Sequence, residues 1–261
     1  MPAYADFARF YDQVMGDRTP VIERIRGYVR RYLPDAGTLL ELGCGTGAVL
    51  AGLADGLRVT GIDRSPEMLA AATGRNLAGA RLVQADITEF SLGTRFDVVI
   101  CVFDTLNHLP TFDAWLAMFR QVDAHLAEGG LFIFDVNTVG RLSRLAAAPA
   151  YVEDFGPHTL IMDVTTGGAG VFPWDVRIFE RVKDDQFLLH HERIGELGVP
   201  LARIHEALTP RFELLEATNT EGRPANDESD RAYFVYRHRA SGSGGPDGQP
   251  GAWPGARRAA R

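Results

Sequence analysis

Hydrophobic and polar positions follow two different spacings along the first half of the chain. Segments such as 112–126 place apolar residues three and four positions apart, as on one face of an amphipathic helix. Between such segments stand short, nearly continuous apolar runs, typical of strands that are buried on both faces of a parallel sheet. These runs occupy 38–42, 58–63, 80–86, 96–103 and 131–136. The alternation of strands and helices predicts an α/β fold with a doubly wound, mostly parallel sheet.

The spacing changes after Asn137. Residues 151–195 contain several strand-like runs that are separated by Gly- and Asp-rich turns, which predicts a small antiparallel β insertion after the fifth strand. A short helix at 200–208 and strands at 212–218 and 231–239 then return to the main sheet, which would hold seven strands. Two amphipathic helices, at 3–15 and 19–33, precede the first strand.

A glycine-rich loop follows the first strand. The sequence of residues 38–47 is Thr-Leu-Leu-Glu-Leu-Gly-Cys-Gly-Thr-Gly, and a helix begins directly after it. Glycine tolerates positive φ and lets the backbone approach a ligand closely. A strand end, a bare backbone and a helix N-terminus therefore meet at the edge where open α/β sheets bind ligands. Glu41 precedes the glycines and the loop has no Lys or Arg, which favours a cationic head group over a diphosphate.

Acidic residues also follow the next two strands. Asp63 is positioned to accept hydrogen bonds from ribose hydroxyls. Asp86, followed by Ile87, could accept a hydrogen bond from an adenine amino group while the isoleucine packs on the ring. The glycine spacing alone also fits the G-x-G-x-x-G/A dinucleotide fingerprint, so these positions leave NAD and S-adenosylmethionine both open.

Four segments in order carry a resemblance to a known family. They are Glu-Leu-Gly-Cys-Gly-Thr-Gly (41–47), Gly-Ile-Asp-Arg-Ser (61–65), Gln-Ala-Asp-Ile (84–87) and Phe-Asp-Val-Val-Ile-Cys (96–101). Over roughly residues 4–240 the chain resembles the class I S-adenosylmethionine-dependent methyltransferases. Residues 101–109 and 229–236 resemble a narrower bacterial group of small stand-alone methyltransferases and, more distantly, amino-sugar N-methyltransferases.

The resemblance implies a division of the chain into functional parts. We expect N-terminal helices (1–34) that close as a lid over the cofactor, and a Rossmann-like cofactor-binding core (35–137). The β insertion (138–199) would cap the acceptor pocket, and residues 200–240 would complete the sheet. Residues 241–261 lack the apolar content for a packed structure and are predicted to be disordered.

The resemblance also implies a set of cofactor contacts. The expected S-adenosylmethionine-binding residues are Tyr11, Glu41, Gly43, Gly45, Asp63, Arg64, Met68, Asp86, Ile87 and Phe103. For Tyr11 and Met68, a role in core packing explains the residue about as well.

The methyl acceptor is expected beyond the fourth strand. The candidate substrate contacts are Asp104, Asn107, His191 and Arg231. Asp104 and Asn107 could instead cap the next helix, and Arg231 could pair with the acidic residues at 227, 228 and 230. His108 is the candidate general base; alternatively it starts a helix and hydrogen-bonds to a loop carbonyl. No metal site is expected.

Composition and charge limit the kinds of molecule that we expect this protein to bind. The formal net charge is −7 and no basic patch is evident, which argues against nucleic acid. The two cysteines, Cys44 and Cys101, form no disulfide or metal pattern, and no apolar run is long enough to span a bilayer. The resemblance implies a methyltransferase, and together with this composition it leads us to expect a cytoplasmic monomer or homodimer that methylates a small molecule at nitrogen or oxygen. Two alternatives remain: a methyltransferase for protein or tRNA, and a nicotinamide-dependent oxidoreductase or non-catalytic nucleotide-binding module.

A thermal-shift experiment separates the cofactor alternatives. A ligand that binds only the native state must raise the melting temperature. We expect S-adenosylhomocysteine to raise it and NADH to leave it unchanged. Stabilisation by NADH alone would contradict the methyltransferase interpretation.

Overall fold

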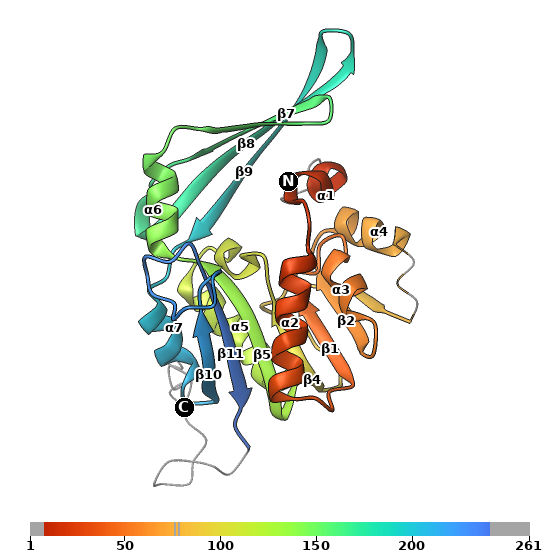
Figure 1. The fold of residues 1–261 in the computed structure, drawn as a ribbon, viewed down its shortest axis with the longest axis vertical. Helices are drawn as coiled ribbons and strands as arrows, with labels where there is room; N and C mark the ends of the chain where they lie inside the picture. Colours follow the sequence, from red (N-terminus) through yellow and green to blue (C-terminus); the bar gives the residue numbers. More distant parts are fainter. Residues whose placement is uncertain (1–7, 76, 78, 241–261) are drawn as a thin grey trace, which may run out of the picture.

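The computed structural model describes residues 8–75, 77 and 79–240, which form two sheets (Figure 1). The larger sheet has seven strands in the order β10-β11-β5-β4-β1-β2-β3. The strands β1 to β5 run parallel, and β11 and β10 pair antiparallel at one edge. Their bounds are β1 Thr38–Leu42, β2 Arg58–Asp63, β3 Arg81–Gln84, β4 Phe96–Cys101, β5 Leu126–Asn137, β10 Phe212–Thr218 and β11 Arg231–His238. This confirms the predicted doubly wound sheet.

Helices cover both faces of this sheet, as its continuous apolar strands require. On one face, α5 (Phe112–His125) and α7 (Leu201–Leu208) bury a cluster that includes Trp115 and Phe119. On the other face, α2 (Thr19–Tyr32) and α3 (Ala48–Leu53) bury residues such as Ile25 and Leu50. The helix α4 (Pro66–Gly74) follows β2. Successive residues of β4 alternate between the two clusters, so the sheet is buried on both sides.

The second sheet is the predicted insertion. Its four antiparallel strands lie in the order β6-β7-β8-β9. They are β6 Tyr151–Phe155, β7 His158–Val164, β8 Val171–Lys183 and β9 Gln186–Leu197. This sheet stands beyond the carboxyl ends of the parallel strands, and α1 (Ala8–Met15) lies between it and the core (Figure 1). Phe10 of α1 packs into the insertion with Leu160, Val176 and Ile178.

Several local predictions differ from the structure. The helix α6 (Val139–Ala147) and a short helical turn, Thr105–His108, were not predicted. β5 begins at Leu126 instead of 131. Within this added stretch Gly129 has a φ of +74°, and the pairing of β5 with β4 is irregular between Phe96 and Val98. Residues 3–7 of the predicted first helix, and the predicted disordered tail at 241–261, lie outside the described residues.

No helix within the described part of the chain has the length and apolar character needed to cross a membrane.

Candidate active site

Two cavities meet at the carboxyl edge of the parallel strands. The first lies over the glycine loop, and every predicted cofactor residue except Glu41 lines it. The second, of about 510 Å³, lies between the insertion sheet, α1 and α6, a size typical of small-molecule sites. Tyr11, Phe103 and His108 line both cavities. A ligand in the first cavity would therefore lie next to a ligand in the second.

The glycine loop of the first cavity is held open by Asp63. Its Oδ2 accepts a hydrogen bond from the Gly45 amide (2.8 Å) and its Oδ1 accepts one from the Ser65 amide (2.9 Å). Gly45 has a φ of +52°, and a Cβ at this position would find only the Tyr11 ring nearby, at 3.8 Å. The backbone at Gly45 thus faces open cavity, as a close-fitting ligand requires.

Two buried groups of opposite charge lie near the loop. Glu41 is 2% exposed and its Oε2 makes no hydrogen bond. Burial, and then the negative charge of Asp63, raise the Glu41 pKa. The Nη2 of Arg18 is also buried without a hydrogen bond, and its guanidinium lies over the rings of Tyr11 (5.4 Å) and Phe103 (5.1 Å). Arg18 Nη2 also lies 3.6 Å from Asp12 Oδ1, and neither Arg18 nor Glu41 lines the first cavity. An α-amino carboxylate that reached them would give Glu41 a donor and Arg18 an acceptor.

The far end of the first cavity suits a nucleoside. Asp86 and Ile87 line it together with Arg64 and Met68. The Ser65 hydroxyl caps α4 by accepting a hydrogen bond from the Met68 amide (3.2 Å). This bond positions the first turn of α4, from which Met68 lines the cavity. Asp86 Oδ1 accepts hydrogen bonds from the Thr88 amide and hydroxyl at 2.8 and 2.6 Å, which orients its carboxylate.

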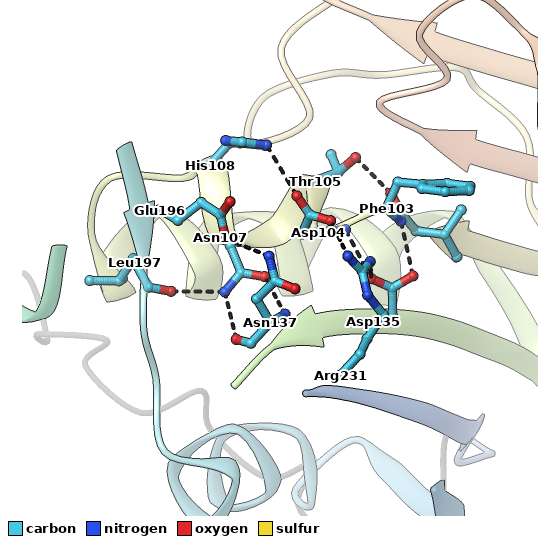
Figure 2. A network of polar contacts seen from close by, with 11 residues as sticks. Phe103, Asp104, Thr105, Asn107, His108, Asp135, Asn137, Glu196, Leu197 and Arg231 are labelled. Carbon is cyan, nitrogen blue, oxygen red and sulfur yellow. Dashed lines mark hydrogen bonds and ion pairs between the residues drawn. The ribbon is translucent and has the colours of Figure 1, made fainter. Parts of the chain in front are cut away.

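The turn after β4 forms the boundary between the cavities. Phe103 and Asp104 have positive φ values of 57° and 50°, which is unfavourable for residues with side chains. Asp135 on β5 holds the turn by accepting hydrogen bonds from both amides at 2.9 Å (Figure 2). Arg231 on β11 in turn pairs with Asp135 (2.5 Å) and Asp104 (2.6 Å).

Three titratable side chains gather beside this turn. His108 Nε2 lies 3.6 Å from Asp104 Oδ2, and Glu196 on β9 approaches from the insertion. Burial, together with the negative charge of Asp104, raises the Glu196 pKa to about 7. Burial opposes protonation of His108, but its contacts with Asp104, Glu196 and the Gly195 backbone raise its pKa overall. Arg231 and then His108 outweigh the burial of Asp104 and lower its pKa.

This cluster has the spacing of a metal site. One ligand atom from each of Asp104, His108 and Glu196 lies within 4.8 Å of the others. However, Asp104 Oδ1 already pairs with Arg231, and Glu196 Oε2 accepts a hydrogen bond from Asn137 Nδ2 at 2.7 Å. The guanidinium would repel a cation. We therefore interpret the cluster as a set of groups that share protons.

The structure places two predicted substrate contacts away from the second cavity. Asn107 is fully buried, and its amide bonds to the backbone of Asn137 and Leu197 (3.0 Å each) instead of lining a cavity. His191 pairs with Asp175 (2.9 Å) on the outer face of the insertion. Side chains alternate along a strand, so the cavity receives Glu192, Ile194 and Glu196 from β9, and not His191.

Arg231 and Asp104 do line the second cavity. The acidic residues near Arg231 in sequence have other partners: Glu228 and Asp230 pair with Arg144, and Asp227 accepts a hydrogen bond from the Leu201 amide. Three residues of this region were not predicted from the sequence: Arg18, Asp135 and Glu196. No motif marks them, because each acts through partners that are distant in sequence.

Most of the second cavity is apolar. Its walls are contributed by α1, α6 and the inner face of the insertion sheet, and the acidic cluster lies at the end next to the first cavity. The apolar lining residues include Val14, Met15, Leu145, Leu160, Met162, Val164, Trp174, Val176 and Ile194.

Comparisons with known proteins identify the family and support the fold. The family described as "Methyltransferase domain" matches residues 39–130. A Geobacillus sp. (strain WCH70) protein that bears the name "Putative methyltransferase" is 31% identical over 90% of this chain and 99% of its own. A dTDP-3-amino-3,6-dideoxy-alpha-D-glucopyranose N,N-dimethyltransferase of Streptomyces fradiae is 35% identical, but the match spans only 50% of this chain and 52% of that protein.

Solved structures share the whole fold. An S-adenosylmethionine-dependent methyltransferase from Clostridium acetobutylicum superimposes with a TM-score of 0.81 at 22% identity, covering 90% of this chain and 99% of that one. The sugar N-methyltransferase KedS8 from Streptoalloteichus gives a TM-score of 0.75 at 24% identity, covering 89% and 92%. At sequence identities of 22% and 24%, these two structures show only that the chain shares their fold.

Replacement of Asp63 tests the first cavity. We expect Asp63→Ala to weaken S-adenosylhomocysteine binding by about 1–3 kcal/mol, because a ribose and the Gly45 amide would both lose a hydrogen-bond acceptor. Titration calorimetry measures the loss, and Asp55→Ala, an exposed acid before β2, serves as control. Wild-type affinity in Asp63→Ala would contradict this role.

Proposed function

This chain belongs to the S-adenosylmethionine-dependent methyltransferases, and from this premise we propose that it methylates an amine nitrogen of a small molecule bound in the second cavity. The observation that carries the proposal is the cluster of Asp104, His108 and Glu196 where the two cavities meet. Buried carboxylates attract an ammonium, and a titrating pair can remove its proton. Amino-sugar N,N-dimethyltransferases among the relatives support an amine acceptor.

The first cavity would hold the cofactor in a fixed orientation. We assign its nucleoside to Asp63 and Asp86, which line the cavity. We assign its ammonium and carboxylate to Glu41 and Arg18, which are buried near the glycine loop without lining the cavity. The bound cofactor supplies an electrophilic methyl group on a cationic sulfur. With Phe103 at the boundary, the reactive end would face the second cavity.

The acidic cluster would prepare the acceptor. An incoming ammonium gives one proton to the His108–Glu196 pair, which frees the nitrogen lone pair. The freed lone pair would then be available to the electrophilic methyl group that the bound cofactor would supply, and the electrons of the carbon–sulfur bond would remain on sulfur. Asp104 stays ionised beside Arg231 and orients His108. Most of the acceleration would come from alignment of the reacting atoms, which the closed walls of the insertion favour.

The proposed organisation assigns a role to each part of the fold. The insertion (138–199) would roof the acceptor site, and α1 would close over the cofactor, because Tyr11 lines both cavities. Thr46 of the glycine loop donates a hydrogen bond to Asp12 of α1 (2.7 Å), while Phe10 packs on the insertion. Residues 35–137 and 200–240 would form the rigid base.

Methyl uptake from labelled S-adenosylmethionine tests the acceptor class. The acceptors are matched pairs that differ only in an amine or a hydroxyl, including amino sugars linked to a nucleotide and their hydroxy counterparts. We expect label in the amine members only, and no loss of activity with a chelator. Labelling of the hydroxyl members, or of added protein or tRNA alone, would overturn the proposal.

The pH dependence of the rate tests the cluster. Because protonated His108 and Glu196 cannot accept another proton, kcat/KM should fall as the pH drops below about 7. His108→Asn should lower kcat about 100-fold or more and leave the cofactor affinity intact. The contribution of His108 to the decrease of kcat/KM at low pH should also disappear.

Glu196→Gln removes a negative charge that raises the His108 pKa. The decrease of kcat/KM with falling pH should therefore occur at lower pH in this variant. Glu206→Gln, an exposed carboxylate on α7, is the control and should keep the wild-type profile. Wild-type rate and pH profile in both cluster variants would exclude the cluster from proton transfer.

A further inference from the structure

We infer that the acceptor also carries an anionic group, a phosphate or a carboxylate, and that Arg141 binds this group at the α6 end of the second cavity. The inference rests on the proposed function, because it takes the second cavity as the acceptor site. It specifies the acceptor as a molecule that bears both an amine and an anion.

No ion pair involves the Arg141 side chain within residues 8–75, 77 and 79–240. It lies in the first turn of α6, where its amide bonds to the Thr138 side chain, and its side chain lines the cavity beside that of Leu145 one turn later. Its Nε is buried and makes no hydrogen bond. Among the described residues no carboxylate forms an ion pair with it, although Glu153 and Glu192 also line the cavity.

Other arginines nearby are neutralised. Arg144, on the same helix, pairs with Asp230 (2.6 Å) and Glu228 (3.4 Å). Arg231, at the other end of the cavity, pairs with two carboxylates. A partly buried guanidinium without an anion lowers the stability of the folded protein. Arg141 is therefore the arginine of this cavity whose charge a bound anion would neutralise.

A second buried donor supports the same position. The indole Nε1 of Trp174 is buried without a hydrogen-bond partner, and Trp174 both lines the cavity and packs against the apolar side of α6. Guanidinium and indole N–H groups donate to phosphate or carboxylate oxygens, and charge-assisted bonds of this kind are strong.

The inner end of the cavity has the opposite polarity. Asn137 Oδ1 is a buried acceptor without a hydrogen bond, and it lines the cavity beside Glu196. An ammonium could donate to this oxygen. One unsatisfied acceptor thus lies next to the acidic cluster, and unsatisfied donors lie at α6. The remaining lining is mostly apolar and includes the carboxylates of Glu153 and Glu192. This separation matches a ligand with an amine at one end and an anion at the other.

Binding of charged and uncharged probe pairs tests the inference without turnover. The protein is saturated with S-adenosylhomocysteine and titrated calorimetrically with thymidine diphosphate against thymidine, and with octanoate against octanol. We expect the anion of at least one pair to bind tenfold or more tightly than its uncharged counterpart. The first pair would identify a phosphate and the second a carboxylate.

Variants at two arginines assign the effect. Arg141→Gln should remove the preference for the anion, Arg141→Lys should keep part of it, and Arg144→Gln should leave it unchanged. The S-adenosylhomocysteine affinity of each variant reports whether the fold is intact. Absence of a preference in both pairs, or a preference that survives Arg141→Gln, would overturn the inference. Methyl transfer to an amine that carries no anion, unaffected by Arg141→Gln, would overturn it while leaving the proposed function in place.

Discussion

The structure depends most on the buried ion pairs that join Arg231 to Asp104 and Asp135. Arg231 begins an antiparallel edge strand, yet its guanidinium reaches the end of the central strand β4. Without it, two buried carboxylates would face each other, and breaking such a pair commonly costs about 3–5 kcal/mol. The pairs also hold Phe103 and Asp104 in an unfavourable conformation. Both cavities are built against this turn, so their relative position depends on it.

The same region joins the insertion to the core. The Asn107 amide donates to carbonyls at the ends of β5 and β9, and Asn137 donates to Glu196. These bonds set where the last residues of β9 lie, and therefore which side chains of the insertion enter the second cavity. At the opposite side, α1 contacts both the insertion and the glycine loop. The two sheets are thus held together on both sides of the second cavity.

The sequence predicted features that depend on local pattern and missed those that depend on tertiary pairing. The strands, the glycine loop and the acidic residues at the strand ends follow from spacing and from the rule that parallel strands end at one edge. Arg18 and Glu196 carry no such signal, because their partners are far away in sequence. His191 was misplaced for a related reason: its face is decided by the pairing of β8 with β9 and by where β9 meets the core. The alternation of Glu192, Ile194 and Glu196 was the available signal for the inner face.

The distribution of charge in the acidic cluster favours an amine over a hydroxyl as the acceptor in our proposal. Arg231 keeps Asp104 ionised, so Asp104 orients its neighbour and does not titrate near neutrality. Glu196, with a pKa of about 7, and His108 can then exchange a proton. Such a pair can deprotonate an ammonium, whose pKa is about 10, at a modest energetic cost. A hydroxyl group, with a pKa closer to the value of about 15.7 for water, would need a much stronger base or a metal ion. The guanidinium that fixes Asp104 also disfavours a metal, so the same ion pair that shapes the turn limits the chemistry the cluster can support.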